Sequence, residues 1–435
     1  MEKLNLSTVI IGYITLGISI LFFLIFFLQI AYTFLALFIK NKKFKKTDVY
    51  NNHAILIPAH NEGHIIADLV KSLKAMDYPA DKFKVFVVAD NCTDNTADVA
   101  REAGADKVYE RFNKELIGPN FAIHETLLKI KDEFGTFDSF SWFDADNIVE
   151  KEWLSKMNDA FNHPKKYDYF TSFRDTQNFE DNWISSSYSI EFYRLVSQIA
   201  TVRSVFKNPH MVGGTGFMVR WEILEKNDYW GKYKSMVHDT EFSFDALSNN
   251  YKGIYVDGAR FYDLQPTKMS VSWKQRTRWT VGNLKLGHTI WGKIFKNLFF
   301  KFEAPQKKLN YLDYIAMLSP AWIWFVVLFI FNTTLTVLNG VLLGFGQVDF
   351  WKFLGVLSLP LMFVWYYLSA WFMGLAVIIR QCKKMKRISG WSKFKALFGY
   401  PIFLFLNVPI SIYAQKNINM KFVNTKKERS TKTMI

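Results

Sequence analysis

The stretch Ser141-Trp142-Phe143-Asp144-Ala145-Asp146-Asn147 ends an apolar run in two carboxylates that one small residue separates. The apolar part, which begins at Phe140, is typical of a buried strand. Side chains i and i+2 of a strand point to the same face. If the extended conformation continues, Asp144 and Asp146 therefore converge on one point. The alternative is a solvated turn, because a bare D-x-D pattern is short and common.

Two carboxylates held this close repel each other unless a cation lies between them. A hard divalent ion such as Mg2+ or Mn2+ prefers oxygen ligands and keeps coordination sites for phosphate oxygens. The pattern therefore predicts a Mg2+ or Mn2+ site at Asp144 and Asp146.

Strand and helix patterns alternate on both sides of this stretch, from His53 to about residue 265. Short runs rich in β-branched residues occupy 53–58 and 84–89, and helical spacing occupies 65–76 and 96–103. A repeat of about 30 residues favours a doubly wound α/β domain with a parallel sheet. In such sheets ligands bind beyond the carboxyl ends of the strands.

Polar clusters follow three of the predicted strands at those ends. Pro58 to Glu62 follows the first strand, Asp90 to Asp94 the second, and Asp144 to Asp146 the fourth. Helix capping by Asp94 or Asn95 is an alternative for the second cluster, and capping is compatible with ligand contact. Together the clusters predict one site at this edge of the sheet.

The chain is segregated into apolar and basic segments. It has 435 residues, a formal net charge of +15 and 50% hydrophobic residues. Residues 8–39 hold no charged side chain. This uncharged run is longer than the ~20 apolar residues needed to cross a bilayer. The lysine-rich segment 40–46 follows, so the positive-inside rule places the N-terminus outside and the next domain in the cytoplasm. The basic residues cluster beside apolar segments, which favours membrane lipid over nucleic acid as the partner.

Membrane character returns after residue 280. Aromatic and aliphatic residues recur at helical spacing with lysines between them from Ile290 to Lys301, which indicates a helix in the membrane interface; a core-facing helix of the α/β domain is the alternative. Residues 314–343 and 353–379 are predicted to span the membrane, joined by a short external turn at 344–349, and 396–414 to form a re-entrant or interfacial segment. The predicted domains are an anchor with its basic flank (1–46), an α/β domain (47–285), an interface helix (286–310) and a membrane region with a basic tail (311–435).

Three further motifs lie late in the predicted α/β domain. The glycines of 213–216 would let a ligand approach the backbone, although a strand bulge is the more common explanation for such a motif by itself. Val237 to Phe242 is an acid-rich turn that enters a helix, and capping by Asp239 is its alternative. Gln275 to Trp279 sets two arginines beside an indole. Arginine matches phosphate geometry and tryptophan offers a flat face to a sugar ring, whereas such a cluster beside a membrane also serves as an interfacial anchor.

The order and spacing of these motifs resemble the inverting family 2 glycosyltransferases, in particular the membrane-integrated cellulose, hyaluronan, chitin-oligosaccharide and poly-N-acetylglucosamine synthases. The resemblance covers Ala54 to about Gly282. It implies a GT-A fold inserted between an N-terminal transmembrane helix and a C-terminal helical membrane region. It also implies a UDP-sugar donor, a glycan or lipid acceptor, and an integral protein of the plasma membrane with a cytoplasmic catalytic domain.

The resemblance also implies a role for each motif residue. The general base would be Asp239; donor-binding residues would be Pro58, Glu62, Asp90, Asp144, Arg276 and Arg278; acceptor-binding residues would be Gly214, Thr215, Gln275 and Trp279; and the metal ligands would be Asp144 and Asp146. The sequence departs from the family at Val237-His238-Asp239, where the family has T-E-D, and at Gly118-Pro119-Asn120, where the family often has a lysine after the glycine.

Two activities are compatible with these residues. The first is a processive synthase that elongates a β-linked polysaccharide and passes it through its own helices; a homo-oligomer would widen a channel that a few spans make narrow. The alternative is a non-processive enzyme that transfers one sugar to a membrane lipid. A transporter or scaffold without catalysis is disfavoured, because the predicted spans lack the ionisable residues that a transport pathway normally exposes.

Overall fold

The N-terminal half of the α/β domain alternates strands and helices, as the sequence predicts. The computed structural model describes Gly17 and residues 27–301, 305–318 and 349–420. Its first elements are β1 (His53–Ala59), α2 (Ile66–Lys74), a 3-10 turn (Ala80–Lys82), β2 (Phe83–Asp90), α3 (Thr96–Glu102), β3 (Lys107–Arg111), α4 (Pro119–Phe134) and β4 (Ser139–Trp142).

The second half of the domain is less regular. It comprises β5 (Ile148–Val149), α5 (Trp153–Phe161), β6 (Tyr169–Thr176), α6 (Trp183–Phe192), a π-helix (Tyr193–Ile199), α7 (Ala200–Val205), β7 (Phe217–Arg220), α8 (Trp221–Lys226), a 3-10 turn (Asp228–Trp230), α9 (His238–Ser248) and β8 (Gly253–Asp263).

All eight of these strands form one sheet in the order β3-β2-β1-β4-β7-β6-β8-β5. The strands β1 to β4 are parallel, whereas β7 runs antiparallel to both β4 and β6. The prediction of a parallel sheet is therefore correct for β1 to β4, β6 and β8, which run in one direction, and wrong for β7 and β5, which run in the opposite direction. The short apolar run of β7 fits either direction, because parallel and antiparallel strands share the same period of two.

The sheet is buried on both faces. Alternate residues of β1 belong to different apolar clusters: Ile55 and Ile57 pack with α2 and α5, whereas Ala54 and Leu56 pack with α4, α8 and α9. This alternation follows from the pleat of a strand. The loops at the carboxyl ends of β1, β2 and β4 remain as the accessible part of this half.

The prediction that the extended conformation continues through Asp144 and Asp146 is wrong. β4 ends at Trp142, and residues 144–147, here called the acid turn, form a turn in which Asn147 N–H donates to the Asp144 carbonyl at 3.0 Å. A turn lets the backbone bonds of this short segment close locally and leaves the carboxylates on a loop rather than on one strand face.

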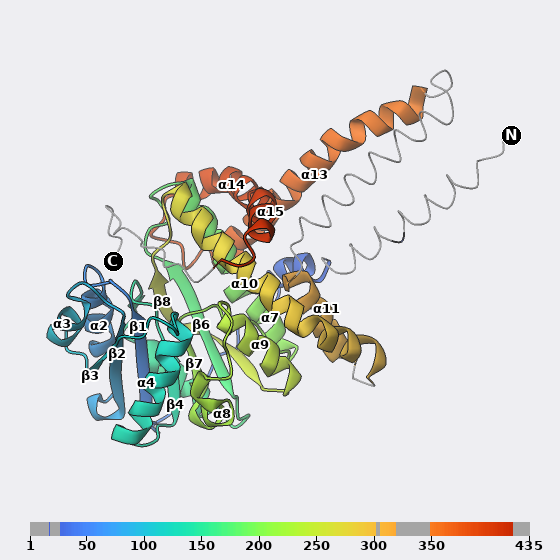
Figure 1. Ribbon diagram of the computed structural model, residues 1–435. Coiled ribbons are helices and arrows are strands. Elements are labelled where there is room, and N and C mark those ends of the chain that lie inside the picture. The colour runs from blue at the N-terminus through green and yellow to red at the C-terminus, as the bar shows by residue number, and fades with distance from the viewer. Residues whose placement is uncertain (1–16, 18–26, 302–304, 319–348, 421–435) are drawn as a thin grey trace.

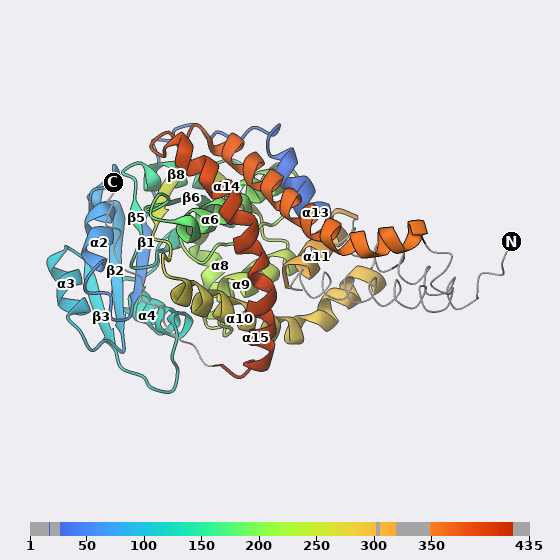
Figure 2. The same cartoon turned by 90° about the horizontal axis from the view of Figure 1, so that it is seen from above.

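Helices follow the sheet and pack beside it. They are α10 (Met269–Phe295), a π-helical turn (Lys296–Phe300), α11 (Pro305–Leu318), α13 (Asp349–Gln381), α14 (Gly390–Phe405) and α15 (Asn407–Lys416). In Figures 1 and 2, α13 projects away from the sheet while α14 and α15 return across α6 and α10. The domain boundary predicted at residue 285 falls inside α10, which is continuous.

Two described segments, Phe363–Gln381 and Gly390–Lys416, are long and apolar enough to cross a membrane. The second includes the predicted re-entrant segment, and its helix is interrupted at Leu406. Residues 27–35 are helical. The rest of the predicted N-terminal span, most of the span at 314–343, the external turn at 344–349 except Asp349, and the tail from 421 lie outside the described residues.

Candidate active site

Asp90 lies at the carboxyl end of β2 and is held by its neighbours. Its Oδ1 accepts from Arg111 Nη1 at 2.7 Å and from Asn91 Nδ2 at 2.9 Å. Arg111 also binds Glu125 through two contacts of 2.7 Å. Burial raises the pKa of the Asp90 carboxyl, and the Arg111 guanidinium acts against that shift. Asp90 is therefore placed rigidly at the edge where the sequence predicts a donor site.

The turn after β1 lies beside Asp90. The ring Nδ1 of His60 lies 2.7 Å from the Asp90 carbonyl oxygen, and Glu62 N–H donates to Thr96 Oγ1 at 2.9 Å. Pro58 pairs in register with Val88 of β2. The predicted donor residues Pro58, Glu62 and Asp90 therefore share one edge of the sheet.

The acid turn is tied to residues 213–216, here called the glycine loop. Asp144 N–H donates to Thr215 Oγ1 at 2.9 Å, and the Thr215 hydroxyl donates to Asn147 Oδ1 at 2.5 Å. Trp142 Nε1 donates to Asp144 Oδ1 at 3.2 Å, and Asn147 Nδ2 donates to Asp146 Oδ1 at 3.1 Å. Thr215, predicted to bind acceptor, thus supports the two predicted metal ligands.

The acid turn suits a divalent ion that shares its ligands with a diphosphate. Within the described residues, no three acidic, histidine or cysteine side chains gather as a closed metal site. Asp144 and Asp146 supply hard oxygen donors from one turn, and Mg2+ in nucleotide sites is commonly held by one or two carboxylates plus phosphate oxygens and water. The donor set therefore fits Mg2+ or Mn2+ bound together with a nucleotide.

The glycine loop also reaches the predicted base. Gly214 has φ +80°, and a Cβ built on it would lie 3.3 Å from Asp239 Oδ2. Val212 N–H donates to Ser243 Oγ at 2.9 Å, and that hydroxyl donates to the Asp239 carbonyl at 2.7 Å. The loop therefore lies between the acid turn and the first turn of α9, and a larger residue at Gly214 would crowd the carboxylate.

Asp239 has the properties of a general base. It lies in the first turn of α9, and desolvation by burial raises the pKa of its carboxyl to about 6, against the opposing effects of two backbone hydrogen bonds and of Arg174 and Arg278. A carboxylate with a pKa near neutrality accepts a proton more readily than an ordinary aspartate does.

His238, which departs from the family motif, belongs to the core. Its buried ring stacks on Trp142 with centroids 4.6 Å apart, and burial lowers its pKa to about 3. The ring is therefore neutral near pH 7 and supports the strand that carries the acid turn.

The two arginines of α10 have different surroundings. Arg276 is buried, donates through Nη2 to the Phe403 carbonyl at 2.7 Å and to Asn407 Oδ1 at 2.6 Å, and stacks on the Phe403 ring. Arg278 lies close enough to Asp144 and Asp239 that both carboxylates raise its pKa, although burial lowers it more. Arg278 thus faces the acids, whereas Arg276 joins α10 to α14 and α15.

Trp279 and Gln275 lie on the same helix. The Trp279 ring is edge-on to Tyr188 and Phe192, with centroids 6.2 and 6.1 Å away. Gln275 is buried, and its Oε1 has no hydrogen-bond partner within the described part of the chain. Trp279 therefore lies in an aromatic group that spans α6, α10 and α14.

Sequence reasoning missed Arg174 and Asp263. Arg174 on β6 donates through Nε to Asp263 Oδ2 at 2.9 Å and through Nη1 to the Gly213 carbonyl at 2.7 Å. Asp263 Oδ1 accepts from Asn147 Nδ2 at 3.0 Å. Charged residues inside otherwise apolar strands were the available signal, but only the paired sheet shows that they meet.

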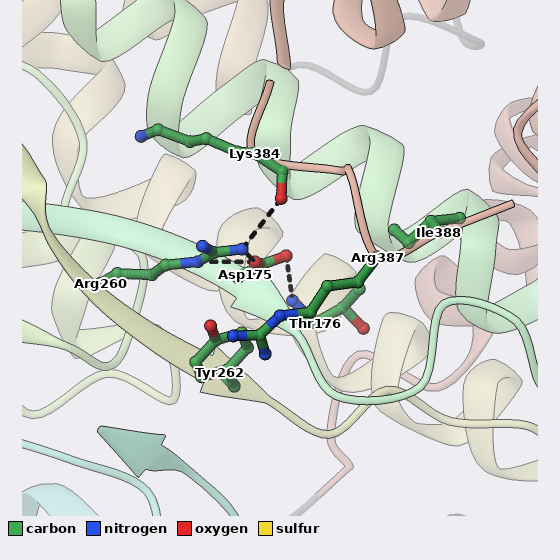
Figure 3. Close-up of a pocket in the computed structure, with 7 residues that line it drawn as sticks. All are labelled: Asp175, Thr176, Arg260, Tyr262, Lys384, Arg387 and Ile388. Carbon is green, nitrogen blue, oxygen red and sulfur yellow. Dashed lines mark hydrogen bonds and ion pairs between the residues drawn. The ribbon is translucent and has the colours of Figure 1, made fainter. Parts of the chain in front are cut away.

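A small cavity, partly open to solvent, lies on the other side of β6 and β8. Figure 3 shows Arg260 between Asp175 and the Lys384 carbonyl oxygen, with Arg387 and Tyr262 nearby. Its lining comes from the strands and from residues 384–388, which follow α13. None of the predicted site residues lines it.

The eight-stranded sheet and the acids at its carboxyl edge define a Rossmann-like α/β domain of the GT-A type. Residues 51–282 match the sequence model described as "Glycosyltransferase like family 2", and the chain belongs to this family. The resemblance found in the motifs is confirmed at the level of the family.

Curated relatives match over the same part of the chain. A probable glycosyltransferase, YdaM of Bacillus subtilis, is 25% identical over 261 residues, which are 56% of this chain and 58% of that protein. A beta-monoglucosyldiacylglycerol synthase of Nostoc is 25% identical over 255 residues, 56% and 51% of the two chains. An N-acetylglucosaminyltransferase of Rhizobium leguminosarum is 24% identical over 234 residues, 52% and 54%. The chain thus spans little more than half the length of these relatives.

One solved structure shares the fold over almost its whole length. The mannosyltransferase PcManGT of Pyrobaculum calidifontis, in complex with GDP-Man and Mn2+, superposes with a TM-score of 0.52 at 15% identity, over 92% of this chain and 99% of that chain. This similarity supports the GT-A fold.

Proposed function

We propose that this glycosyltransferase is a membrane-bound inverting enzyme that transfers a sugar from a UDP-sugar with the help of a divalent metal. The observation that carries the proposal is that Asp144 and Asp239 both border the glycine loop, Asp144 through Thr215 and Asp239 through Gly214, with Arg278 near both carboxylates. A base, a donor-binding acid and a cation placed together are the groups that a single displacement at a sugar carbon requires.

The donor binds along the carboxyl ends of β1, β2 and β4 in this proposal. Asp90 and the turn from Pro58 to Glu62 hold the uridine, and Asp144 lies beneath the diphosphate. Asp144 and Asp146 would hold Mg2+ or Mn2+, which would supply positive charge against the leaving diphosphate. Arg278 adds a fixed positive charge on the same side.

The acceptor hydroxyl approaches from the side of α9. Asp239 accepts the hydroxyl proton as the oxygen forms a bond to the anomeric carbon, the bond from that carbon to the diphosphate oxygen breaks, and UDP carries away the electron pair. One displacement inverts the configuration, so that an α-linked donor gives a β-linked product.

The acceptor is proposed to be a growing β-linked polysaccharide. Trp279 offers an aromatic face next to helices α6 and α14, and the Gln275 oxygen offers an acceptor for a sugar hydroxyl. These helices adjoin the apolar segments 363–381 and 390–416, which supports synthesis at a membrane.

Transfer of one sugar to a membrane lipid is the second candidate. The specific observation in its favour is that a relative is a beta-monoglucosyldiacylglycerol synthase. In either case the catalytic domain lies on the cytoplasmic face of the plasma membrane, as the basic segment 40–46 predicts.

Membranes that contain the protein, incubated with Mg2+ or Mn2+ and each labelled UDP-sugar in turn, separate these candidates. Long labelled polymer supports processive synthesis, and a single sugar on extracted lipid supports the second candidate. If no donor yields UDP, both candidates are excluded.

A further inference from the structure

Two buried ion pairs join strands β6 and β8, and they face different parts of the molecule. Arg174 and Asp175 are consecutive residues of β6, so their side chains point to opposite faces of the sheet. Arg174 pairs with Asp263 of β8, and Asp175 pairs with Arg260 of β8. The first pair lies next to the proposed active site, whereas the second lines the cavity in Figure 3.

Asp263 is fully buried and collects donors from three segments. Its Oδ2 accepts from Arg174 Nε at 2.9 Å and from Gln265 Nε2 at 2.6 Å, and its Oδ1 accepts from Asn147 Nδ2 at 3.0 Å. Asn147 is the last residue of the acid turn and also contacts Thr215 and Asp146. Asp263 therefore anchors the turn that carries the predicted metal ligands.

Arg174 anchors the glycine loop. Its Nη1 donates to the Gly213 carbonyl at 2.7 Å, and its guanidinium lies 3.6 Å from the centre of the Phe192 ring. Gly213 opens the glycine loop, and the next residue, Gly214, lies against Asp239. One ion pair thus holds both the donor side and the base side of the site.

We propose that Arg174 and Asp263 are a positioning pair that fixes the acid turn relative to the glycine loop, so that metal-bound UDP lies at the correct distance from Asp239. This inference rests on the function proposed above. Neither residue is assigned contact with the reacting atoms. Its physical basis is that an error of ~1 Å in the position of a reacting group can cost about 100-fold in rate.

A double replacement separates positioning from stability. Removing one partner alone would leave a buried charge unpaired, which is strongly destabilising, whereas replacing both with apolar residues of similar volume is often neutral. In Arg174→Met/Asp263→Leu the acid turn and the glycine loop lose their common anchor while the interior stays apolar. The fold is expected to persist with a melting temperature near that of the parent.

The second ion pair supplies a matched control. In Arg260→Met/Asp175→Leu a buried pair between the same two strands is removed, but its contacts are Tyr193, Glu150 and the Lys384 carbonyl rather than the acid turn or the glycine loop. The two double variants thus lose similar interactions in different places.

The experiment measures Mn2+ binding in the presence of UDP by electron paramagnetic resonance, together with the transfer rate, on the full-length protein in membranes or detergent. The Arg174→Met/Asp263→Leu protein is expected to bind Mn2+ with UDP about tenfold more weakly and to transfer sugar about 100-fold more slowly, while the control keeps the parent values. A folded variant with the parent's Mn2+ binding and rate would overturn the proposal.

If that variant is unstable, Asn147→Ala decides the question. It leaves the ion pair in place and removes the link from Asp263 to the acid turn, together with the bonds of Asn147 to Thr215 and Asp146, so weaker Mn2+ binding is expected, and unchanged binding contradicts the proposal. A parent protein that binds Mn2+ with UDP but transfers no sugar from any donor would exclude the proposed function. The effect of the variants on Mn2+ binding would still test the positioning role of Arg174 and Asp263. A parent that does not bind Mn2+ with UDP overturns both, because no metal site would then exist to be positioned.

Discussion

The part of the domain proposed to bind the donor, β1 to β4 with their helices, is here called the donor half. The part proposed to bind the acceptor, which includes α9 and α10, is here called the acceptor half. The two hold their polar groups by different means. On the donor side, Asp90 and Arg111 belong to adjacent parallel strands, and Glu125 follows on the next helix. On the acceptor side, Arg276 is held by Phe403 and Asn407, more than 120 residues away in the sequence. The donor half is thus organised by the sheet itself, whereas the acceptor half depends on α14 and α15, which follow the sheet in the chain and return across α6 and α10.

Substitutions in the two halves should therefore impair different properties of the protein. Changes on the donor side should alter nucleotide binding, and changes at Asp239 or Arg278 should alter the rate with nucleotide binding retained. Changes at Arg276 should alter the stability of the helical packing.

The largest effect is expected for Asp239→Asn. The amide cannot accept the acceptor proton, so transfer should fall by about 10²- to 10⁴-fold, whereas UDP binding should stay close to that of the parent. Rate assays and UDP titration measure the two quantities, and Glu241→Gln on the same turn of α9 is the control. Transfer at the parent rate would show that Asp239 is not the base.

The second largest effect is expected for Arg278→Gln, and Arg276→Gln is the variant with which it should be compared. Loss of the Arg278 charge beside Asp144 and Asp239 is expected to lower the transfer rate by ~100-fold. Arg276→Gln should lower the melting temperature, because hydrogen bonds to Phe403 and Asn407 are lost, with a smaller change in rate per folded molecule. The reverse pattern would place Arg276, rather than Arg278, at the diphosphate.

A smaller effect is expected for Asp90→Asn. Its charge-assisted bond to Arg111 is lost while Arg111 keeps Glu125, so UDP affinity should fall by about tenfold. The rate at saturating UDP-sugar should change little. If the variant kept the parent's UDP affinity but transferred sugar more slowly, nucleotide binding could not be assigned to the donor half alone.

The pH dependence gives the mildest test. With a pKa of about 6, Asp239 should be mostly deprotonated at pH 7, and the transfer rate should be about tenfold lower at pH 5. Folding raises the pKa of the Asp239 carboxyl from 3.8 to about 6. The charged carboxylate therefore opposes folding increasingly as the pH rises from 3.8 to about 6. Asp239→Asn should therefore raise the melting temperature at pH 8 and change it little below pH 3.8. A rate profile flat between pH 5 and 7 would contradict this assignment.

Much of the donor half was predictable from short segments. The strands at 53–59 and 83–90 and the helix at 96–102 match their predicted positions, because buried parallel strands are short apolar runs and the intervening helices have a clear period. The sequence left open whether 144–147 stays extended or turns, because an apolar run followed by D-x-D has the same pattern in both cases, and the structure shows a turn.

By itself, the sequence determined the family, the alternation of strands and helices, and the residues available for chemistry, because these depend on residue type and local spacing. Only the tertiary structure decided that β7 runs antiparallel to its two neighbours, that Arg276 packs against α14 and α15 while Arg278 lies near the acids, and that Arg174 and Asp263 join the acid turn to the glycine loop. These outcomes depend on contacts between residues far apart in the chain, and a local pattern carries no information about which distant partner a buried charge will meet.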